Sequence, residues 1–546
     1  MDKKKKQNST AVEETIKRAQ RIREEGEARK EATRLGVSYV NIAGFPINSE
    51  TISMIPEEKA IQYNAVPYLE VADTVRVATT DPQNEKLINY LTTLKKEYKK
   101  DFKPVMASKT GIKFGLGLYK KIEKPTGRKV GEITISKEKV AEEISDMGNL
   151  KEKLQSASTT ELLDILLAGA IGLRSSDIHI VPARDKIRIR FRIDGVLHDV
   201  AEIGKEQYKK LDSRIKFLAK MKMGEDYLPQ DGRFSSKIAG RNIDLRVSTL
   251  PTLHGDSIVA RLLEENQKGI ALEELGFNEE ALKAIQGAIE KPNGMILNTG
   301  PTGSGKTTTL YAIINKLNKP EVKIVTLEDP VEYQIEGIDQ TQIDPRHDLN
   351  FAKGLRAALR QDPDIIMVGE IRDFETASIS LHASLTGHLL LTTLHTNNAP
   401  AAFVRLLDMR IRPFLLVGSI NLAIAQRLVR LICPECKEEY KPKKNEKIAL
   451  ESYLKKNKIK KMPPLYHGKG CSICNKTGYS GRTAIIEFIE PNEEIEKLIM
   501  QEATQSEIEM RAIKSGMKTM LEDGFDKVLA GQTTIEEVLR VTTIEE

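Results

Sequence analysis

The feature that most constrains this chain is a glycine-rich loop between a short apolar run and a segment with helical periodicity. The loop reads Gly300-Pro301-Thr302-Gly303-Ser304-Gly305-Lys306-Thr307-Thr308. Residues 295–298 before it predict a strand, and residues 310–317 after it predict a helix. In this context backbone N–H groups and a helix N-terminus converge on phosphate oxygens. We therefore predict a nucleotide-binding P-loop, with Lys306 at the β- and γ-phosphates and Thr307 on Mg²⁺.

The length and net charge of the chain limit the class of protein that it can be. At 546 residues it exceeds what one hydrophobic core usually serves, so roughly three or four domains are expected. The net charge of +6 is slight for this length and does not indicate a nucleic-acid partner. No apolar run reaches about 18 residues, and no apolar segment follows the basic N-terminus. We expect a modular cytoplasmic protein without a membrane span or secretory signal.

Changes in composition divide the chain into parts that differ in their charged, apolar and turn-forming residues. These are a charged lead-in (1–33), a small N-terminal α/β domain (34–120), a Lys- and Glu-rich linker (121–154), a middle domain (155–266) and a P-loop α/β domain (267–546). A helix should open the middle domain, with Thr159 and Thr160 as capping candidates. The exact limits of the linker are not readable from composition.

Alternating residues in the middle domain predict strands with one apolar and one basic face. Residues 187–193 alternate apolar residues with arginines, and the hairpin-type pair Asp194-Gly195 follows. Residues 243–247 repeat the alternation after the turn-like pair Ala239-Gly240. On spacing alone, an ordinary solvated sheet face explains these arginines as well as a binding function does.

Hydrolysis of a bound nucleotide also needs carboxylates near Mg²⁺ and a group that orients water. Residues 324–330 predict a strand that ends in Glu328 and Asp329, and residues 364–370 predict one that ends in Glu370. Gly369 stands where many NTPases have the magnesium aspartate. Glu370 should therefore serve magnesium, directly or through water, which leaves Glu328 as the better candidate for water activation.

Two histidines, His388 and His395, flank the apolar run 389–394, which predicts another core strand. Most lone histidines are structural. Because these two bracket a strand of a nucleotide-binding sheet, we advance the hypothesis that they donate to the γ-phosphate or to Glu370.

The four cysteines form two CxxC pairs, Cys433/Cys436 and Cys471/Cys474. This spacing in a cytoplasmic protein predicts a zinc ion held by four thiolates, and a closed tetrahedral shell indicates a structural role. A redox dithiol would need only one pair. Further on, residues 517–528 predict a helix with Gly531 after it, and Thr534 with Glu537 would form a capping box for a last helix.

Over residues 35–546 these motifs together resemble the ATPases of bacterial type II secretion and type IV pilus assembly. The matching motifs follow the family's order: residues 176–180, 190–195, 230–233 and 246–249 in the middle domain, then the P-loop, 327–330, 369–373, 387–388 and 394–396, and finally the cysteine pairs and 477–482.

The resemblance implies a PAS-like α+β middle domain, a RecA-like P-loop ATPase domain, a zinc subdomain (430–485) and C-terminal helices (486–546). It also implies ATP, Mg²⁺ and Zn²⁺ as cofactors and a homo-hexamer in which middle-domain arginines complete each ATP site. The candidate arginines are Arg190, Arg192, Arg233 and Arg246. Arginine supplied in this way can raise the rate by ~10³–10⁵.

The family's output is mechanical: ATP hydrolysis drives filament assembly through an inner-membrane platform protein and a cytoplasmic membrane-associated adaptor, so the resemblance implies a protein peripheral to the inner membrane. Whether pilus, secretion or DNA-uptake machinery is served stays open. Arg34-Leu35-Gly36 alone does not make the cyclic-dinucleotide repeat of some relatives. The alternatives to a motor are a nucleotide-dependent regulatory or scaffold protein and a nucleic-acid translocase.

Overall fold

The computed structural model describes residues 23–45, 47, 49–71, 74–98, 100–119, 133–136, 147–157, 161–223, 227–264 and 269–542. Most of the predicted lead-in and linker, and the capping candidates Thr159 and Thr160, lie outside these residues. The chain forms two compact units, one comprising residues 1–132 and 209–223 and the other residues 133–208 and 224–546.

The N-terminal part of the first unit is a small α/β domain, as predicted. After a helix over residues 23–35, its elements are η1 (Ile42–Gly44), α2 (Ser49–Ser53), α3 (Glu57–Tyr63), β1 (Ala65–Val71), β2 (Thr74–Thr79), α4 (Glu85–Tyr98), β3 (Asp101–Met106) and α5 (Lys109–Leu118). Strand β2 pairs antiparallel with β1 and parallel with β3. One apolar cluster joins the sheet to α3 and α4, and a second joins it to α5 and η1.

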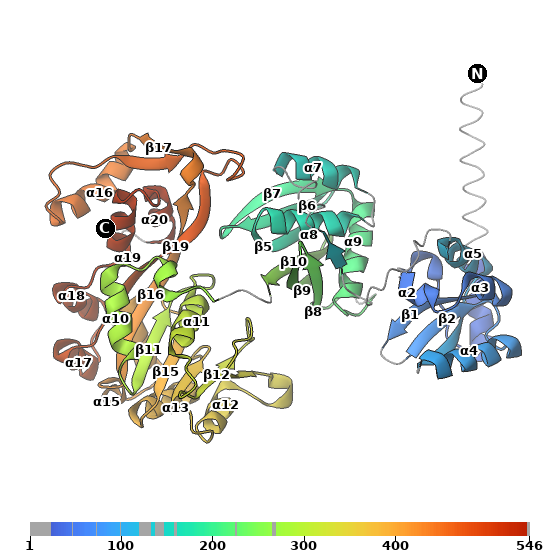
Figure 1. The fold of residues 1–546 in the computed structure, drawn as a ribbon, viewed down its shortest axis with the longest axis horizontal. Helices are drawn as coiled ribbons and strands as arrows, with labels where there is room; N and C mark the ends of the chain where they lie inside the picture. Colours follow the sequence, from blue (N-terminus) through green and yellow to red (C-terminus); the bar gives the residue numbers. More distant parts are fainter. Residues whose placement is uncertain are drawn as a thin grey trace. The chain divides into compact units, whose positions relative to one another are not determined.

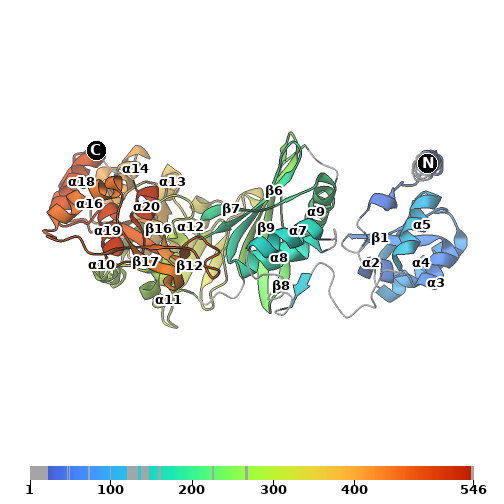
Figure 2. The same ribbon diagram turned by 90° about the horizontal axis from the view of Figure 1, so that it is seen from above.

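The middle domain contains a seven-stranded sheet in the order β4-β8-β9-β10-β5-β6-β7. Its elements are β4 (Ile133–Ile135), α7 (Met147–Ser156), α8 (Leu162–Gly172), β5 (Ser175–Pro182), β6 (Ile187–Ile193), β7 (Val196–Ile203), α9 (Lys205–Leu218), β8 (Gln230–Ile238), β9 (Arg241–Thr252) and β10 (Gly255–Glu264). Helices α7 and α8 pack against the sheet (Figure 2).

Both hairpins predicted for this domain are confirmed. Asp194 and Gly195 join β6 to β7, and Ala239 and Gly240 join β8 to β9, each with positive φ at both turn residues. The isoleucines of β6 and Phe191 are buried, whereas the arginines between them are exposed or half-buried. The alternation therefore produces the two-faced strand that the sequence predicts.

The P-loop domain is built on a second seven-stranded sheet in the order β13-β12-β14-β15-β11-β16-β19, in which all neighbours are parallel except β16 and β19. The strands are β11 (Gly294–Thr299), β12 (Ile324–Glu328), β13 (Asp339–Gln342), β14 (Ile365–Val368), β15 (Leu389–Leu394), β16 (Ile420–Ile432) and β19 (Tyr479–Ile489). The four strands predicted from apolar runs are present within one or two residues of their expected ends.

Helices cover both faces of this sheet (Figure 1). One apolar cluster packs α10 (Glu279–Ile289), α11 (Lys306–Leu317) and η3 (Leu272–Leu275) on one face. A second cluster packs the other face against α12 (Phe351–Ala358), α13 (Phe374–Leu385), α14 (Ala399–Asp408), α15 (Pro413–Leu416) and C-terminal helices. Burial on both faces explains why these strands read as continuous apolar runs.

The last part of the chain adds a small subdomain and a helical tail. The remaining elements are η4 (Pro345–His347), η5 (Pro434–Cys436), β17 (Lys437–Tyr440), α16 (Lys444–Lys456), β18 (Leu465–Gly468), α17 (Glu493–Met500), α18 (Gln505–Lys514), α19 (Met520–Leu529) and α20 (Ile535–Val541). Among the described residues, every helix is too short or too polar to cross a lipid bilayer.

Candidate functional site

The P-loop connects β11 to α11, and its glycines are required by positive φ and, at Gly300, by close backbone approach. A Cβ at Gly300 would lie 2.6 Å from the carbonyl oxygen of Gln426, and Gly305 has a φ of +89° at the N-cap of α11. Lys306 is buried and its Nζ donates to the carbonyl oxygens of Gly300 at 2.7 Å and Pro301 at 3.2 Å. Burial lowers the pKa of Lys306 to about 8. The lysine is therefore held over the loop, where phosphate charge would favour its protonated form.

Two residues of β16 support the loop, and sequence reasoning did not single them out. Gln426 Oε1 accepts hydrogen bonds from Asn298 Nδ2 at 3.1 Å and Thr309 Oγ1 at 2.8 Å, which ties β16 to the strand and helix on either side of the loop. Arg427 Nη2 donates to the carbonyl oxygen of Asn397 at 2.9 Å. Only strand order places β16 beside β11, so no local motif reveals these residues.

Glu328 ends β12 and is 2% exposed. Its Oε1 accepts from Thr326 Oγ1 at 2.6 Å and from Gln340 Nε2 at 3.1 Å, while Oε2 accepts from the hydroxyl of Tyr311. The candidate for water activation is thus a buried carboxylate with donors on both oxygens.

Glu370 follows the neighbouring strand β14 and lies in a more open environment. Its side chain is 17% exposed, its Oε2 lies 3.2 Å from His395 Nε2, and its Oε1 pairs with Arg372. A Cβ at Gly369 would lie 3.2 Å from the carbonyl oxygen of Leu327. This close approach gives a physical reason why glycine stands where an aspartate is common.

The two histidines occupy opposite ends of β15. Because β15 runs parallel to β11, His395 follows Leu394 next to Thr299, just before the P-loop, whereas His388 precedes Leu389, which pairs with Gly294. His388 Nδ1 instead lies 3.1 Å from the carbonyl oxygen of Ala383. Of the two histidines, the structure therefore brings only His395 to the nucleotide edge. We use this name for the edge of the sheet at which Lys306, Glu328, Glu370 and His395 lie.

A row of charged residues crosses the middle-domain sheet. Directly opposed residues on successive strands are Arg233 of β8, Arg246 of β9, Arg261 of β10, Asp177 of β5 and Arg192 of β6. Opposed residues of antiparallel strands project from the same face, so these side chains form one arginine row. Arg261 was not singled out from the sequence, because only strand pairing reveals its neighbours.

The described structure shows internal partners for most of this row. Asp177 Oδ1 accepts from Arg261 Nε at 2.9 Å, and Asp177 Oδ2 lies 3.4 Å from Arg192 Nε. Arg246 Nη2 donates to the carbonyl oxygen of Val331 at 2.7 Å. Arg190 lies two residues before Arg192 on β6, and its Nε is 2.9 Å from Asp199 Oδ1.

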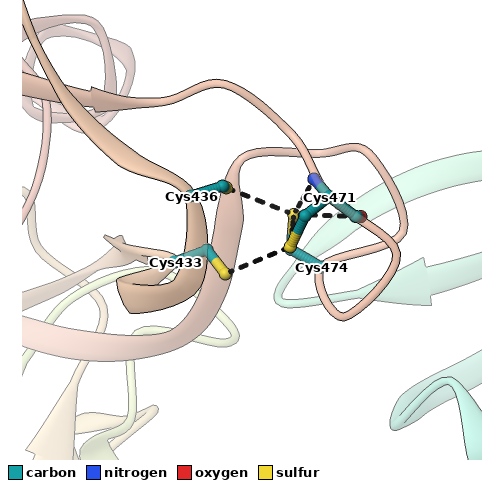
Figure 3. Close-up of side chains that lie close together, drawn as sticks. All are labelled: Cys433, Cys436, Cys471 and Cys474. Atoms are coloured by element: carbon teal, nitrogen blue, oxygen red, sulfur yellow. Dashed lines mark hydrogen bonds between the residues drawn. The ribbon is translucent and has the colours of Figure 1, made fainter.

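The four cysteines converge on one point (Figure 3). All four sulfur atoms lie within 4.8 Å of one another, and three of the separations are 3.9 Å (Cys433–Cys471), 3.8 Å (Cys436–Cys474) and 3.7 Å (Cys471–Cys474). Four sulfurs at about 2.3 Å from a tetrahedral zinc ion would be ~3.8 Å apart. The cysteine cluster, as we call these four residues, fits zinc.

Backbone donors favour the thiolate form at one member of this cluster, Cys474, whereas burial raises the pKa of the Cys433 and Cys436 thiols. The N–H of Gly470 donates to Cys436 Sγ at 3.3 Å, and the N–H of Gly478 donates to Cys474 Sγ at 3.3 Å. Burial raises the pKa of the Cys474 thiol, but N–H donation from Cys471 and Gly478 outweighs it and lowers that pKa to about 7. Metal ligands of this kind bind as thiolates.

A mainly parallel sheet with a P-loop after one strand and carboxylates at the ends of two other strands defines a P-loop nucleotide hydrolase. A family model described as "Type II/IV secretion system protein" matches residues 152–540. The chain belongs to this family, and it is an ATPase.

Relatives agree with this assignment. The chain is 40% identical over 508 residues to the type IV pilus assembly ATPase PilB of Myxococcus xanthus, covering 92% of this chain and 88% of that protein. It is 46% identical over 403 residues to the type II secretion system ATPase E of Vibrio cholerae, covering 74% and 79%. The X-ray structure of the Legionella pneumophila ATPase DotB shares the fold, with a TM-score of 0.52 at 24% identity, over 71% of this chain and 96% of that chain.

A separate model, the MshEN domain, matches residues 35–120. This match assigns the N-terminal domain to a domain family that Arg34-Leu35-Gly36 alone did not establish.

Proposed function

We propose that this protein is a hexameric motor ATPase that powers assembly of a type IV pilus or a type II secretion pseudopilus. The observation that carries the proposal is the nucleotide edge, where strands ending in Glu328 and Glu370 lie in the same sheet as the P-loop strand. The relatives named for pilus assembly and type II secretion support the mechanical output.

Each residue of the nucleotide edge has a proposed role. Residues 300–308 bind the phosphates of ATP, Lys306 neutralises the β- and γ-phosphates, and Thr307 with Glu370 holds Mg²⁺. Glu328 activates the attacking water, and His395 holds Glu370 through the 3.2 Å contact. His388 has no role in this proposal, because it lies at the other end of β15.

The arginine row supplies the charge that completes ATP in a neighbouring subunit of the ring. Four arginines on one sheet face are an unusual concentration of positive charge, and family membership supports their use on phosphate. The proposed set is Arg192, Arg233 and Arg246 of the row together with Arg190, two residues before Arg192 on β6, and Arg261 of the row is an additional member.

Zinc in the cysteine cluster holds the subdomain 430–485 together. The protein works at the cytoplasmic face of the inner membrane, where it contacts a platform protein and a membrane-associated adaptor of the same machinery. No part of the proposal requires nucleic acid, and ATP hydrolysis should not respond to added DNA.

Three substitutions test the roles at the nucleotide edge. Lys306→Ala should abolish ATP hydrolysis in a folded protein, and Glu328→Gln should keep nucleotide affinity and lose turnover, because only the water-activating group is changed. Lys316→Ala is the matched control, since this exposed lysine of the same helix pairs with Glu273. The measurements are phosphate release and binding of a fluorescent ATP analogue. Near-wild-type hydrolysis by Glu328→Gln would transfer the role to Glu370.

The cellular role has its own test. In the bacterium of origin, a chain carrying Lys306→Ala in place of the wild-type protein should support no filament assembly while its protein level stays normal. Normal filaments in that strain would overturn the proposed motor function.

A further inference from the structure

The environment of Glu328 follows from the alternation of β12. Ile324, Thr326 and Glu328 point to one face of the sheet, the face that α11 covers. Gln340 stands directly opposite Thr326 on the edge strand β13. The Glu328 carboxylate is therefore enclosed between its own strand, β13 and the helix that follows the P-loop.

Three donors hold this carboxylate. Thr326 and Gln340 donate to one oxygen, at 2.6 Å and 3.1 Å, and the Tyr311 hydroxyl donates to the other. An ionised carboxylate only accepts hydrogen bonds, so this arrangement satisfies it without water. At 2% exposure, Glu328 in this conformation cannot contact an attacking water.

Tyr311 differs from the other two donors because it belongs to α11, the helix that begins with Lys306 and Thr307. Its ring is fully buried and lies edge-on to Tyr333, with ring centroids 4.6 Å apart. Burial, and then the charge of Glu328, raise the pKa of Tyr311 far above its usual value, so the phenol keeps its proton and remains a donor.

A general base must lie within hydrogen-bond reach of the proton that it takes. Glu328 must therefore leave at least one of its donors before it can act. Thr326 and Gln340 lie on the same sheet as Glu328 and move with it, whereas Tyr311 lies on the helix whose N-terminus binds phosphate.

We propose that Tyr311 is a positioning residue for hydrolysis: its hydroxyl holds Glu328 away from water, and a shift of α11 on nucleotide binding releases the carboxylate. This inference rests on the proposed role of Glu328 in water activation. It identifies a direct link, five residues along one helix, between the phosphate-binding lysine and the general base.

The test is Tyr311→Phe, which keeps the buried ring and removes a hydroxyl that donates to Glu328 and also accepts from the N–H of Glu332 at 3.3 Å. Basal kcat should rise by roughly tenfold, the size expected when a hydrogen bond to a charged group no longer holds the resting state. The KM for ATP should stay within about twofold, because phosphate-binding groups are untouched. A merely structural role would lower kcat or raise KM. Tyr333→Phe, which removes a hydroxyl from the packed neighbouring ring, is the matched control and should not change kcat.

The double variant Tyr311→Phe with Glu328→Gln should be as inactive as Glu328→Gln alone, since the gain depends on a released carboxylate. If Tyr311→Phe leaves kcat unchanged or lowers it while Glu328→Gln is inactive, the role of Tyr311 is wrong and the proposed function stands. If Glu328→Gln still hydrolyses ATP, the role of Glu328 is wrong and this inference fails with it.

Discussion

The nucleotide edge and the cysteine cluster both gather residues that are far apart in sequence, but they do so by different physical means. At the nucleotide edge, parallel strands with apolar packing on both faces carry Lys306, Glu328 and Glu370 to the same edge. The cysteine cluster lies beside the two-stranded sheet β17-β18, and three of its sulfur–sulfur separations are 3.7–3.9 Å. Apolar packing positions the residues of the first region, whereas the sulfurs of the second are gathered at separations that fit its proposed metal.

The comparison also shows what each region lacks. The nucleotide edge carries Glu328, Asp329 and Glu370, and Arg372 already pairs with Glu370 and Asp329, so charge from elsewhere would help to neutralise a bound polyphosphate. The arginine row holds such charge on another sheet, and Asp177 already holds two of its arginines. The cysteine cluster needs only one divalent cation to be complete.

The largest effect should come from Arg192→Ala, which asks whether the nucleotide edge is complete within one chain. If the arginine row completes ATP, turnover should fall by ~10³ while the unfolding midpoint changes little, since the buried carboxylate of Asp177 keeps its ion pair with Arg261. Steady-state phosphate release and thermal unfolding measure the two quantities. Arg188→Ala, on the same strand but outside the row, is the control.

Mixing two inactive variants in one ring then tests whether the arginine comes from the subunit that binds the ATP or from its neighbour. Rings that contain both Arg192→Ala and Lys306→Ala subunits should regain some activity if each chain completes the site of its neighbour. Unchanged turnover when Arg192, Arg233, Arg246 and Arg261 are each changed to alanine would show that the row is an ordinary sheet face with no role in hydrolysis.

A second prediction separates the two regions. Cys471→Ser should reduce the zinc content below one ion per chain and lower the stability of residues 430–485, because structural zinc binding contributes about 10–16 kcal/mol in small sites. Nucleotide affinity should stay near wild type, since the P-loop strand β11 and helix α11 pack in an apolar cluster that contains no residue of α16, β17 or β18. Elemental analysis, limited proteolysis and ATP-analogue binding measure these effects, with Ser472→Ala as the control.

The outcomes that would contradict this prediction are measured on protein purified without chelators. A wild-type chain with no zinc, or a Cys471→Ser variant that loses ATP binding together with the metal, would contradict the distinction between a core-shaped and a metal-shaped region.

The smallest expected effect is a change in proton binding by Lys306 at the nucleotide edge. Burial lowers the pKa of Lys306 from 10.5 to about 8, so the unfolded chain binds more protons than the folded chain between these values. The contribution of Lys306 to the free energy of unfolding should therefore increase with pH in that window. A bound polyphosphate restores the charged lysine, so binding above pH 8 should take up a proton.

Calorimetric titration with a non-hydrolysable ATP analogue near pH 9, in two buffers of different ionisation enthalpy, measures this uptake. Lys306→Met should remove it and Lys316→Ala should retain it. Equal uptake in wild type and Lys306→Met would assign the proton to another group.

Local sequence determined much of this protein. The P-loop, the strands that end in Glu328 and Glu370, and the two hairpins follow from periodicity and turn chemistry over a few residues, so they could be predicted without the fold. The cysteine pairs also converge as their spacing predicts, because each CxxC pair already brings two sulfurs together.

Tertiary structure decided the partners of these residues. Thr534 caps α20 as predicted, but Glu537 does not complete the capping box; its carboxylate instead pairs with Arg430 and Arg540. Strand pairing alone aligned Arg261 with Arg246, and helix packing alone brought Tyr311 to Glu328. Sequence patterns report which way a side chain points along its own helix or strand, whereas strand order and packing determine what it meets there.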